Sequence, residues 1–304
     1  MDEQVFEPEN DSSIEITEKE VVKEEVMPKR AIETPLNDAT PAKEVAKEVA
    51  KEAVVETPIA KQSNESSIQT RTEKSRVATG IKGFDNLIEG GFEKDSTVLL
   101  VGSAGTGKTL FSMQFLYEGA TKFDEKCVFI SFEEEKSSLY KHALQFGWDF
   151  EKLERENKFK LLFFKPHQVT KILEEGGGQI REALMEIGAK RVVVDSITSY
   201  ALLFTDEYKR REKVLEFFNL LEKWGVTSIV IAENSPQVIE KEEGSLGFIS
   251  DAVISMYYQH DEEKGIRIHS LEILKMRGTR HTNKLCAFNF EEEGIVVYPD
   301  VEVF

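Results

Sequence analysis

The residues with the clearest chemical role form one short run, Gly102-Ser103-Ala104-Gly105-Thr106-Gly107-Lys108-Thr109. Its spacing matches the pattern G-x-x-x-x-G-K-[ST], which binds a nucleoside triphosphate when it follows a strand and opens a helix. The glycines let backbone N–H groups converge on phosphate oxygens, and the first turn of the helix adds unpaired N–H groups. We expect Lys108 to reach the β- and γ-phosphates and the Thr109 hydroxyl to bind Mg²⁺.

Carboxylates follow two other apolar runs. Asp195 ends the run that starts at Val192, and Glu133 and Glu134 follow Cys127–Phe132. Ligands of parallel α/β sheets bind where strands end, so we expect Asp195 to hold Mg²⁺ through water. One of the two glutamates would activate the attacking water. The alternative for Asp195 is that it caps the next turn. The alternative for the two glutamates is that they belong to a solvated acidic run.

The elements that must position these residues alternate between apolar runs and helical patterns. Strands are predicted at Thr97–Val101, Cys127–Phe132, Lys160–Phe164, Arg191–Asp195 and Thr227–Ala232. Helices are predicted from the glycine-rich run to about Ala120 and near Ser137–Phe146, Gln168–Ile187 and Glu207–Trp224. This alternation predicts an α/β fold with a mostly parallel sheet flanked by helices on both faces.

The pattern of predicted elements changes after Ser250. Short strand-like runs follow one another without a long helix, at Asp251–Gln259, Ile266–Met276, Leu285–Phe290 and Ile295–Tyr298. We expect C-terminal antiparallel hairpins that extend the same sheet, so that residues 76–304 form one domain.

Residues 1–75 differ in composition from the rest of the chain. They contain ten Lys and Arg residues against eighteen Asp and Glu residues, and they have no glycine. Such a segment buries too little apolar surface to offset its chain entropy, so we expect a disordered acidic tail. Within it, residues 43–54 repeat with period four, which is typical of a transient solvated helix or of a helix that docks on a partner protein.

The bulk composition narrows the classes of protein. The acidic start of the chain is unlike a secretory signal, no run is long enough to span a bilayer, and the two cysteines have no metal-binding spacing. We therefore expect a cytoplasmic protein in a reducing compartment. The formal net charge of −17 disfavours nucleic acid as a partner, because binding to its phosphates depends on Lys and Arg.

Several motifs together resemble a single KaiC domain, a member of the RecA superfamily of ATPases. They are Thr79–Leu87 with Gly90-Gly91, the glycine-rich run with Leu110–Tyr117, Ser131–Glu134, Phe146–Trp148, Asp195–Ser199 and Leu271–Thr279. The similarity extends from about Thr79 to Pro299. It implies a RecA-like fold and ATP bound with Mg²⁺ between the subunits of a homo-oligomeric ring, usually a hexamer.

The resemblance also implies roles for individual residues. Glu133 and Glu134 would be the catalytic pair. Lys275 and Arg277, in the stretch Lys-x-Arg-Gly-Thr, would reach the γ-phosphate held by the neighbouring subunit, with His281 near the nucleotide. A cation supplied across an interface stabilises the charge of the transferring phosphoryl group.

The chain departs from the clock protein of this family in three respects. It has one such domain instead of two in tandem, and its acidic tail has no counterpart. Gly247 and Phe248 stand where the autokinase half carries phosphoacceptor hydroxyls, so clock-type autophosphorylation is not expected. The expected function is ATP hydrolysis that regulates a partner protein, which could be bound through residues 1–75.

Two other functions fit the same fold. A RadA-like DNA recombination or repair ATPase needs a basic loop toward the pore, but Gln237–Ser245 has one lysine against three glutamates. A nucleotide-gated scaffold with minimal turnover would lack the glutamate pair or the cations of the Lys-x-Arg stretch, and this sequence has both.

Overall fold

The computed structural model describes residues 75–233, 246–261 and 265–301. Three predicted segments lie outside these ranges: the acidic tail up to residue 74, its period-four segment at residues 43–54, and the loop Gln237–Ser245. Among the described residues, no helix is long and apolar enough to cross a membrane.

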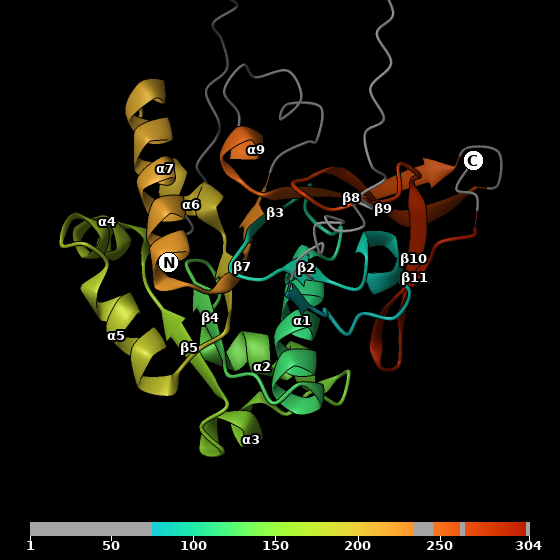
Figure 1. The fold of residues 1–304 in the computed structure, drawn as a ribbon, viewed down its shortest axis with the longest axis horizontal. Helices are drawn as coiled ribbons and strands as arrows, with labels where there is room; N and C mark the ends of the chain where they lie inside the picture. Colours follow the sequence, from blue (N-terminus) through green and yellow to red (C-terminus); the bar gives the residue numbers. More distant parts are fainter. Residues whose placement is uncertain (1–74, 234–245, 262–264, 302–304) are drawn as a thin grey trace, which may run out of the picture. The chain divides into compact units, whose positions relative to one another are not determined.

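A nine-stranded sheet carries the described elements, in the order β11-β10-β9-β8-β3-β7-β6-β4-β5 (Figure 1). Neighbouring strands from β8 through to β5 are parallel, and β9, β10 and β11 are added antiparallel. The strands are β3 (Thr97–Gly102), β4 (Cys127–Ser131), β5 (Phe159–Phe163), β6 (Arg191–Asp195), β7 (Thr227–Ala232), β8 (Ala252–Asp261), β9 (Ile266–Met276), β10 (Cys286–Glu291) and β11 (Gly294–Tyr298). The α/β fold and the C-terminal antiparallel strands predicted from the sequence are both confirmed.

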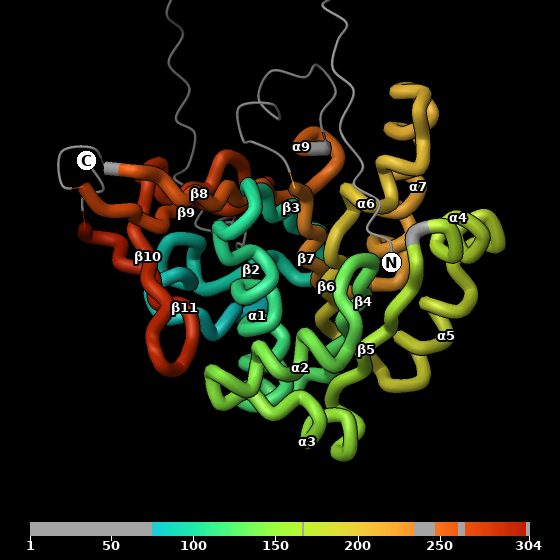
Figure 2. Tube along the Cα trace, turned by 180° about the vertical axis from the view of Figure 1, so that it is seen from behind, coloured from blue at the N-terminus to red at the C-terminus, as the bar shows by residue number. Residues whose placement is uncertain are grey.

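Helices cover both faces of the sheet (Figures 1 and 2). They are α1 (Lys108–Lys122), α2 (Lys136–Leu144), α3 (Phe150–Arg155), α4 (Pro166–Glu174), α5 (Gly178–Ile187), α6 (Ile197–Ala201), α7 (Glu207–Trp224) and α9 (Leu246–Ile249). Before β3, the short strands β1 (Arg76–Val77) and β2 (Phe92–Glu93) pair antiparallel around the 3₁₀ helix η1 (Asp85–Ile88).

Successive side chains of β3 pack alternately into two hydrophobic cores, one on each face of the sheet. Leu100 packs in the cluster that α1 covers, together with Phe111. Leu99 packs in the cluster that α7 covers, together with Phe217. Because successive side chains of a strand point to opposite faces, a strand covered on both faces must be apolar throughout. All six residues of β3 are buried, which holds the end of this strand rigidly where the glycine-rich run begins.

The one predicted helix that the structure corrects is Gln168–Ile187, which is two helices, α4 and α5. The break falls at Gly176 and Gly177, whose φ angles are +79° and +73°. A positive φ ends a helix, and glycine adopts it without the steric cost that a Cβ brings. The short helices α3 and α6 were not predicted, since neither is long enough to show a period of 3.6 residues.

Candidate functional site

The glycine-rich run forms the turn between β3 and α1, and we call Gly102–Thr109 the phosphate loop. Gly105 and Gly107 have φ angles of +81° and +90°. At Gly107 a Cβ atom would also lie 2.8 Å from the ring of Phe290, so both conformation and space require glycine there. The loop therefore leads directly into the N-terminus of a 15-residue helix, where backbone N–H groups lack partners within the helix.

Lys108 is held inside this loop. Its side chain is 6% exposed, and Nζ donates a 2.9 Å hydrogen bond to the carbonyl oxygen of Ser103. The hydroxyl of Thr106 donates to the same carbonyl, also at 2.9 Å. Burial lowers the pKa of Lys108, whereas the negative charges of Glu233, Asp195 and Glu133 act to raise it. The ammonium group therefore lies near three carboxylates and inside the loop, where it could also contact a bound polyphosphate.

Asp195 lies directly beside the start of α1. The Thr109 hydroxyl donates a 2.7 Å hydrogen bond to Asp195 Oδ2, which joins the first turn of α1 to the end of β6. Asp195 is buried, and burial raises its pKa to about 7, with further contributions from Glu133 and Glu134. The ionised carboxylate is thus short of stabilising positive charge.

These two oxygen donors fit Mg²⁺. Magnesium prefers hard oxygen ligands and is usually held by one or two protein groups together with phosphates and waters. In the described ranges no group of three or more His, Cys, Asp and Glu side chains could hold a metal by itself. A hydroxyl and one under-compensated carboxylate beside a phosphate loop match the ligand set of a metal that arrives with a nucleotide.

The two glutamates after β4 are held differently. Glu133 Oε1 accepts hydrogen bonds from the hydroxyls of Ser196 and Ser199, the latter at 2.6 Å. Glu134 Oε2 accepts a 2.8 Å hydrogen bond from Ser138 at the start of α2, and its backbone N–H donates to Ser131. The predicted glutamate pair is therefore split between two orienting networks at the same edge of the sheet.

A cavity of about 330 Å³ opens beside the phosphate loop. It has a polar end, formed by the loop with Glu134 and Glu233, and a more apolar end between α1 and α2. Its lining comprises Ala104, Gly105, Gly107, Lys108, Thr109, Leu110, Met113, Glu134, Leu139, His142 and Glu233. One end thus suits phosphate groups and the other suits a less polar part of a ligand.

Glu233 is the site residue that the sequence analysis missed. It directly follows the last residue of β7, and its backbone N–H donates a 2.8 Å hydrogen bond to the Thr198 hydroxyl. The signal was present, because an acidic residue follows a buried apolar strand here just as at Asp195.

The three remaining predicted residues are not among those that line the cavity at the phosphate loop. Lys275 lies in β9, and its Nζ donates to the carbonyl oxygens of Gly247 and Ser250 at 2.7 Å each. Arg277 follows β9 and contacts Asp251 at the start of β8. His281 is half-buried, with Nδ1 2.8 Å from the carbonyl oxygen of Thr282.

The position of Arg277 along β3 separates it from the phosphate loop of its own chain. The backbone N–H of Arg277 donates to the carbonyl oxygen of Asp251, whose own N–H donates to the carbonyl oxygen of Thr97. Thr97 begins β3 and Gly102 ends it, so the two lie about 16 Å apart at 3.3 Å per residue. Arg277 is therefore level with the opposite end of the strand from the phosphate loop.

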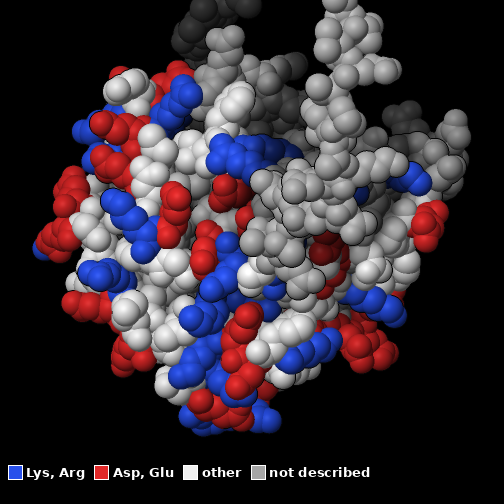
Figure 3. Space-filling model, viewed as in Figure 1, with Lys and Arg blue, Asp and Glu red and all other residues white. Residues whose placement is uncertain are grey.

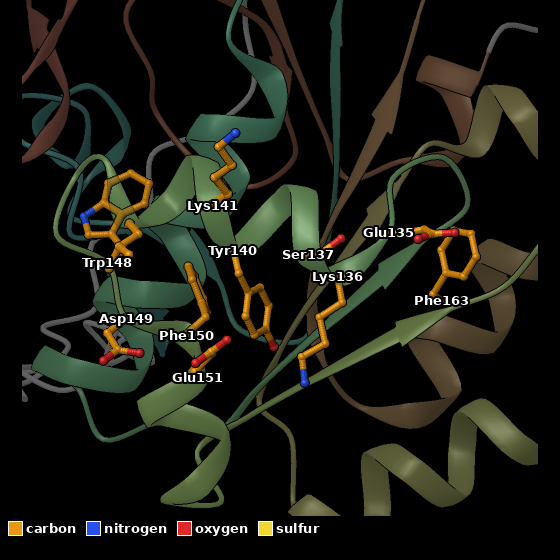
Figure 4. Close-up of a pocket in the computed structure, with 11 residues that line it drawn as sticks. Glu135, Lys136, Ser137, Tyr140, Lys141, Trp148, Asp149, Phe150, Glu151 and Phe163 are labelled. Carbon is orange, nitrogen blue, oxygen red and sulfur yellow. The ribbon is translucent and has the colours of Figure 1, made fainter.

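A larger cavity, of about 820 Å³, lies elsewhere and is lined mainly by residues of α2, of α3 and of the segment between them (Figure 4). Tyr140, Trp148 and Phe163 are among its lining residues. It shares no lining residue with the cavity at the phosphate loop, so size alone does not identify the functional site.

Known proteins share both the sequence pattern and the fold. The family described as "ATPase: KaiC" matches residues 77–302. The circadian clock oscillator protein KaiC of Prochlorococcus marinus is 34% identical in an alignment of 239 positions that covers 76% of this chain and 46% of that protein. The chain thus spans about half the length of the clock proteins that it matches.

Other similar proteins match along nearly their whole length. A UPF0273 protein of Methanocaldococcus jannaschii is 33% identical over 74% of this chain and 97% of its own. The crystal structure of a KaiC-like protein from Pyrococcus horikoshii superposes with a TM-score of 0.66 and 40% identity, covering 74% of this chain and all of the other. The chain belongs to the KaiC-like ATPases of the RecA superfamily.

Proposed function

We propose that this chain hydrolyses ATP in the presence of Mg²⁺ at the phosphate loop, and that a second copy of the chain completes the site. The observation that carries the proposal is the 2.7 Å hydrogen bond between Thr109 and Asp195, which brings the two metal-binding groups together beside Lys108. Family membership supports ATP as the ligand.

The residues divide the work of hydrolysis between them. Phosphate-loop N–H groups and Lys108 bind the β- and γ-phosphates, and Thr109 and Asp195 hold the metal, which would neutralise phosphate charge. The glutamate pair, Glu133 and Glu134, orients the attacking water and accepts its proton. As the new bond forms between this oxygen and the γ-phosphorus, the bond to the bridging oxygen breaks and ADP leaves with the electron pair.

The cations of Lys275 and Arg277 serve the phosphate of a neighbouring copy. Arg277 is about 16 Å along β3 from the loop of its own chain, too far to contact a phosphate bound there. In the ring that the family resemblance implies, usually of six copies, each interface would pair the loop of one chain with the cations of the next. We place this ring in the cytoplasm and expect its turnover to regulate a partner protein.

A DNA motor is the weaker candidate. Binding a nucleic-acid backbone depends on clustered Lys and Arg side chains. Acidic side chains lie among the basic ones over the described part of the face in Figure 3, and the whole chain carries a net charge of −17.

Mixing two inactive variants tests the shared site. Lys108→Ala disables the phosphate loop but keeps the cations, whereas Arg277→Ala keeps the loop but removes a cation. Each variant alone should release little phosphate from Mg-ATP. A mixture should regain turnover, because Arg277→Ala loops would meet Arg277 of Lys108→Ala neighbours. If the mixture is no more active than the sum of its components, the site is not shared between chains.

A further inference from the structure

Asp251 links the start of β3 to Arg277, the cation that the proposed function assigns to the phosphate of a neighbouring copy. Its Oδ1 lies 3.3 Å from Nη1 of Arg277, and its Oδ2 accepts a 2.9 Å hydrogen bond from the backbone N–H of Thr97. The backbone of Asp251 is bonded to the same two residues: its N–H donates to the Thr97 carbonyl and its carbonyl accepts from the Arg277 N–H, at 2.9 and 2.8 Å.

These contacts fix the carboxylate itself. Two of the four hydrogen bonds, one from the backbone of Asp251 and one to its carboxylate, tie the start of β8 to Thr97 at the start of β3. All six residues of β3 are buried. A side chain anchored to such a strand has little freedom, so Asp251 presents its Oδ1 to Arg277 from a rigid position.

The guanidinium of Arg277 is held at two points. Nη2 donates a 2.7 Å hydrogen bond to the carbonyl oxygen of Phe248 in α9, and Nη1 faces Asp251. A guanidinium has five N–H donors in a planar fork, so it can bind a phosphate oxygen without giving up either contact. Two anchors therefore select one orientation of a long side chain and leave donors available for a ligand.

We propose that Asp251 is a positioning residue, which holds Arg277 in the orientation needed at the phosphate site of a neighbouring copy. This inference rests on the proposed function, because it assumes that Arg277 acts across an interface. Both side chains are largely exposed, at 55% for Arg277 and 41% for Asp251. Exposed ion pairs add little to folding stability, so the pair has more effect on where the guanidinium points than on whether the chain folds.

Asp251→Asn is the informative substitution. The amide oxygen can still accept the hydrogen bond from Thr97, while the amide nitrogen, a donor, would face the guanidinium and repel it. We expect turnover to fall about tenfold or more, since misplacing a catalytic group by about 1 Å can cost up to a hundredfold. ATP affinity should change less than twofold, because the phosphate loop of the same chain is untouched.

Mixing separates positioning from a general structural defect. In equal mixture with Lys108→Ala, half of the Asp251→Asn loops should meet a neighbour with intact Asp251 and Arg277. Turnover per intact loop should then rise about fivefold over Asp251→Asn alone, if copies assemble at random in a closed ring. A defect confined to the β3 of the mutated chain would show no such rescue.

One control variant and one replacement variant complete the experiment. Glu186→Gln removes an exposed ion pair with Lys160 at 2.6 Å and should leave turnover unchanged. Asp251→Ser keeps a hydroxyl acceptor for the Thr97 N–H, and it replaces Asp251→Asn in every assay if the asparagine variant does not fold.

The outcomes are distinguishable. Rescue of both Arg277→Ala and Asp251→Asn by Lys108→Ala supports the inference. Rescue of Arg277→Ala alone, or wild-type turnover in Asp251→Asn, overturns the role of Asp251 and leaves the shared site standing. Rescue of neither variant overturns the shared site, and the role of Asp251 falls with it.

Discussion

The Ser199 hydroxyl donates a 2.6 Å hydrogen bond to the carboxylate of Glu133, 66 residues earlier in the chain. The contact joins α6 to a residue two positions past the end of β4, and Ser196 donates to the same oxygen. Two hydroxyl donors on one carboxylate oxygen fix its direction, which suits a group that must orient water.

Ser199→Ala should therefore weaken catalysis more than binding. Losing one of the two donors should lower turnover about fivefold, the equivalent of about 1 kcal/mol for one hydrogen bond. ATP affinity, measured by titration calorimetry, should stay the same. The control is Glu186→Gln, which removes the exposed ion pair with Lys160 and should leave turnover unchanged. Unchanged turnover in Ser199→Ala would show that this contact does not orient a catalytic group.

Asp195→Asn should have opposite effects on the free and the ligand-bound protein. Its raised pKa, about 7, means that the ionised carboxylate that predominates at pH 8 destabilises the fold. Removing that charge should keep or raise the melting temperature of the nucleotide-free protein at pH 8. The extra stability that Mg-ATP confers should shrink, because a metal ligand is lost. An unchanged shift with Mg-ATP, measured by thermal unfolding, would argue against a metal role for this residue.

The buried side chain of Arg191 leads to a prediction about folding stability that does not depend on nucleotide. It is 1% exposed, and its guanidinium donates to Glu125 at 2.6 Å and to the carbonyl oxygen of Phe115 at 2.9 Å. Arg191→Ala should lower the free energy of unfolding by about 3–5 kcal/mol, since it removes a large buried side chain with its hydrogen bonds and leaves a cavity. Urea unfolding measures this loss.

The comparison for Arg191 is Glu125→Gln, which keeps a hydrogen-bond acceptor at the partly exposed partner. It should cost much less than Arg191→Ala. Equal losses of the free energy of unfolding in the two variants would show that the stability comes from the charge pair and not from the burial of Arg191.

Local patterns predicted the part of the site that lies within a few residues of a strand end. The phosphate loop, Asp195 and the glutamate pair each follow an all-buried run, and the carboxyl ends of parallel strands meet at one edge. Thr109 and Asp195 follow this rule, because they lie within hydrogen-bond distance of each other although 86 residues separate them. The same rule, applied to Thr227–Ala232, would have identified Glu233.

Contacts between distant segments could not be predicted in this way. The hydrogen bonds from Ser196 and Ser199 to Glu133 depend on how the turn into α6 faces the end of β4, which no periodicity records. Likewise, the pairing of Asp251 with Arg277 depends on the register between β8 and β9, where a bulge falls between Val253 and Ile254. Such registers are set by packing over the whole sheet.

Phosphate release from Mg-ATP by the full chain is the most direct test of the central claim that the phosphate loop and the glutamate pair form a hydrolytic site. We predict turnover by the wild type, loss of nucleotide binding in Lys108→Ala, and ATP binding without turnover in the double variant Glu133→Gln, Glu134→Gln. Full hydrolysis by either variant, or a wild type that neither binds nor hydrolyses ATP, would contradict the account.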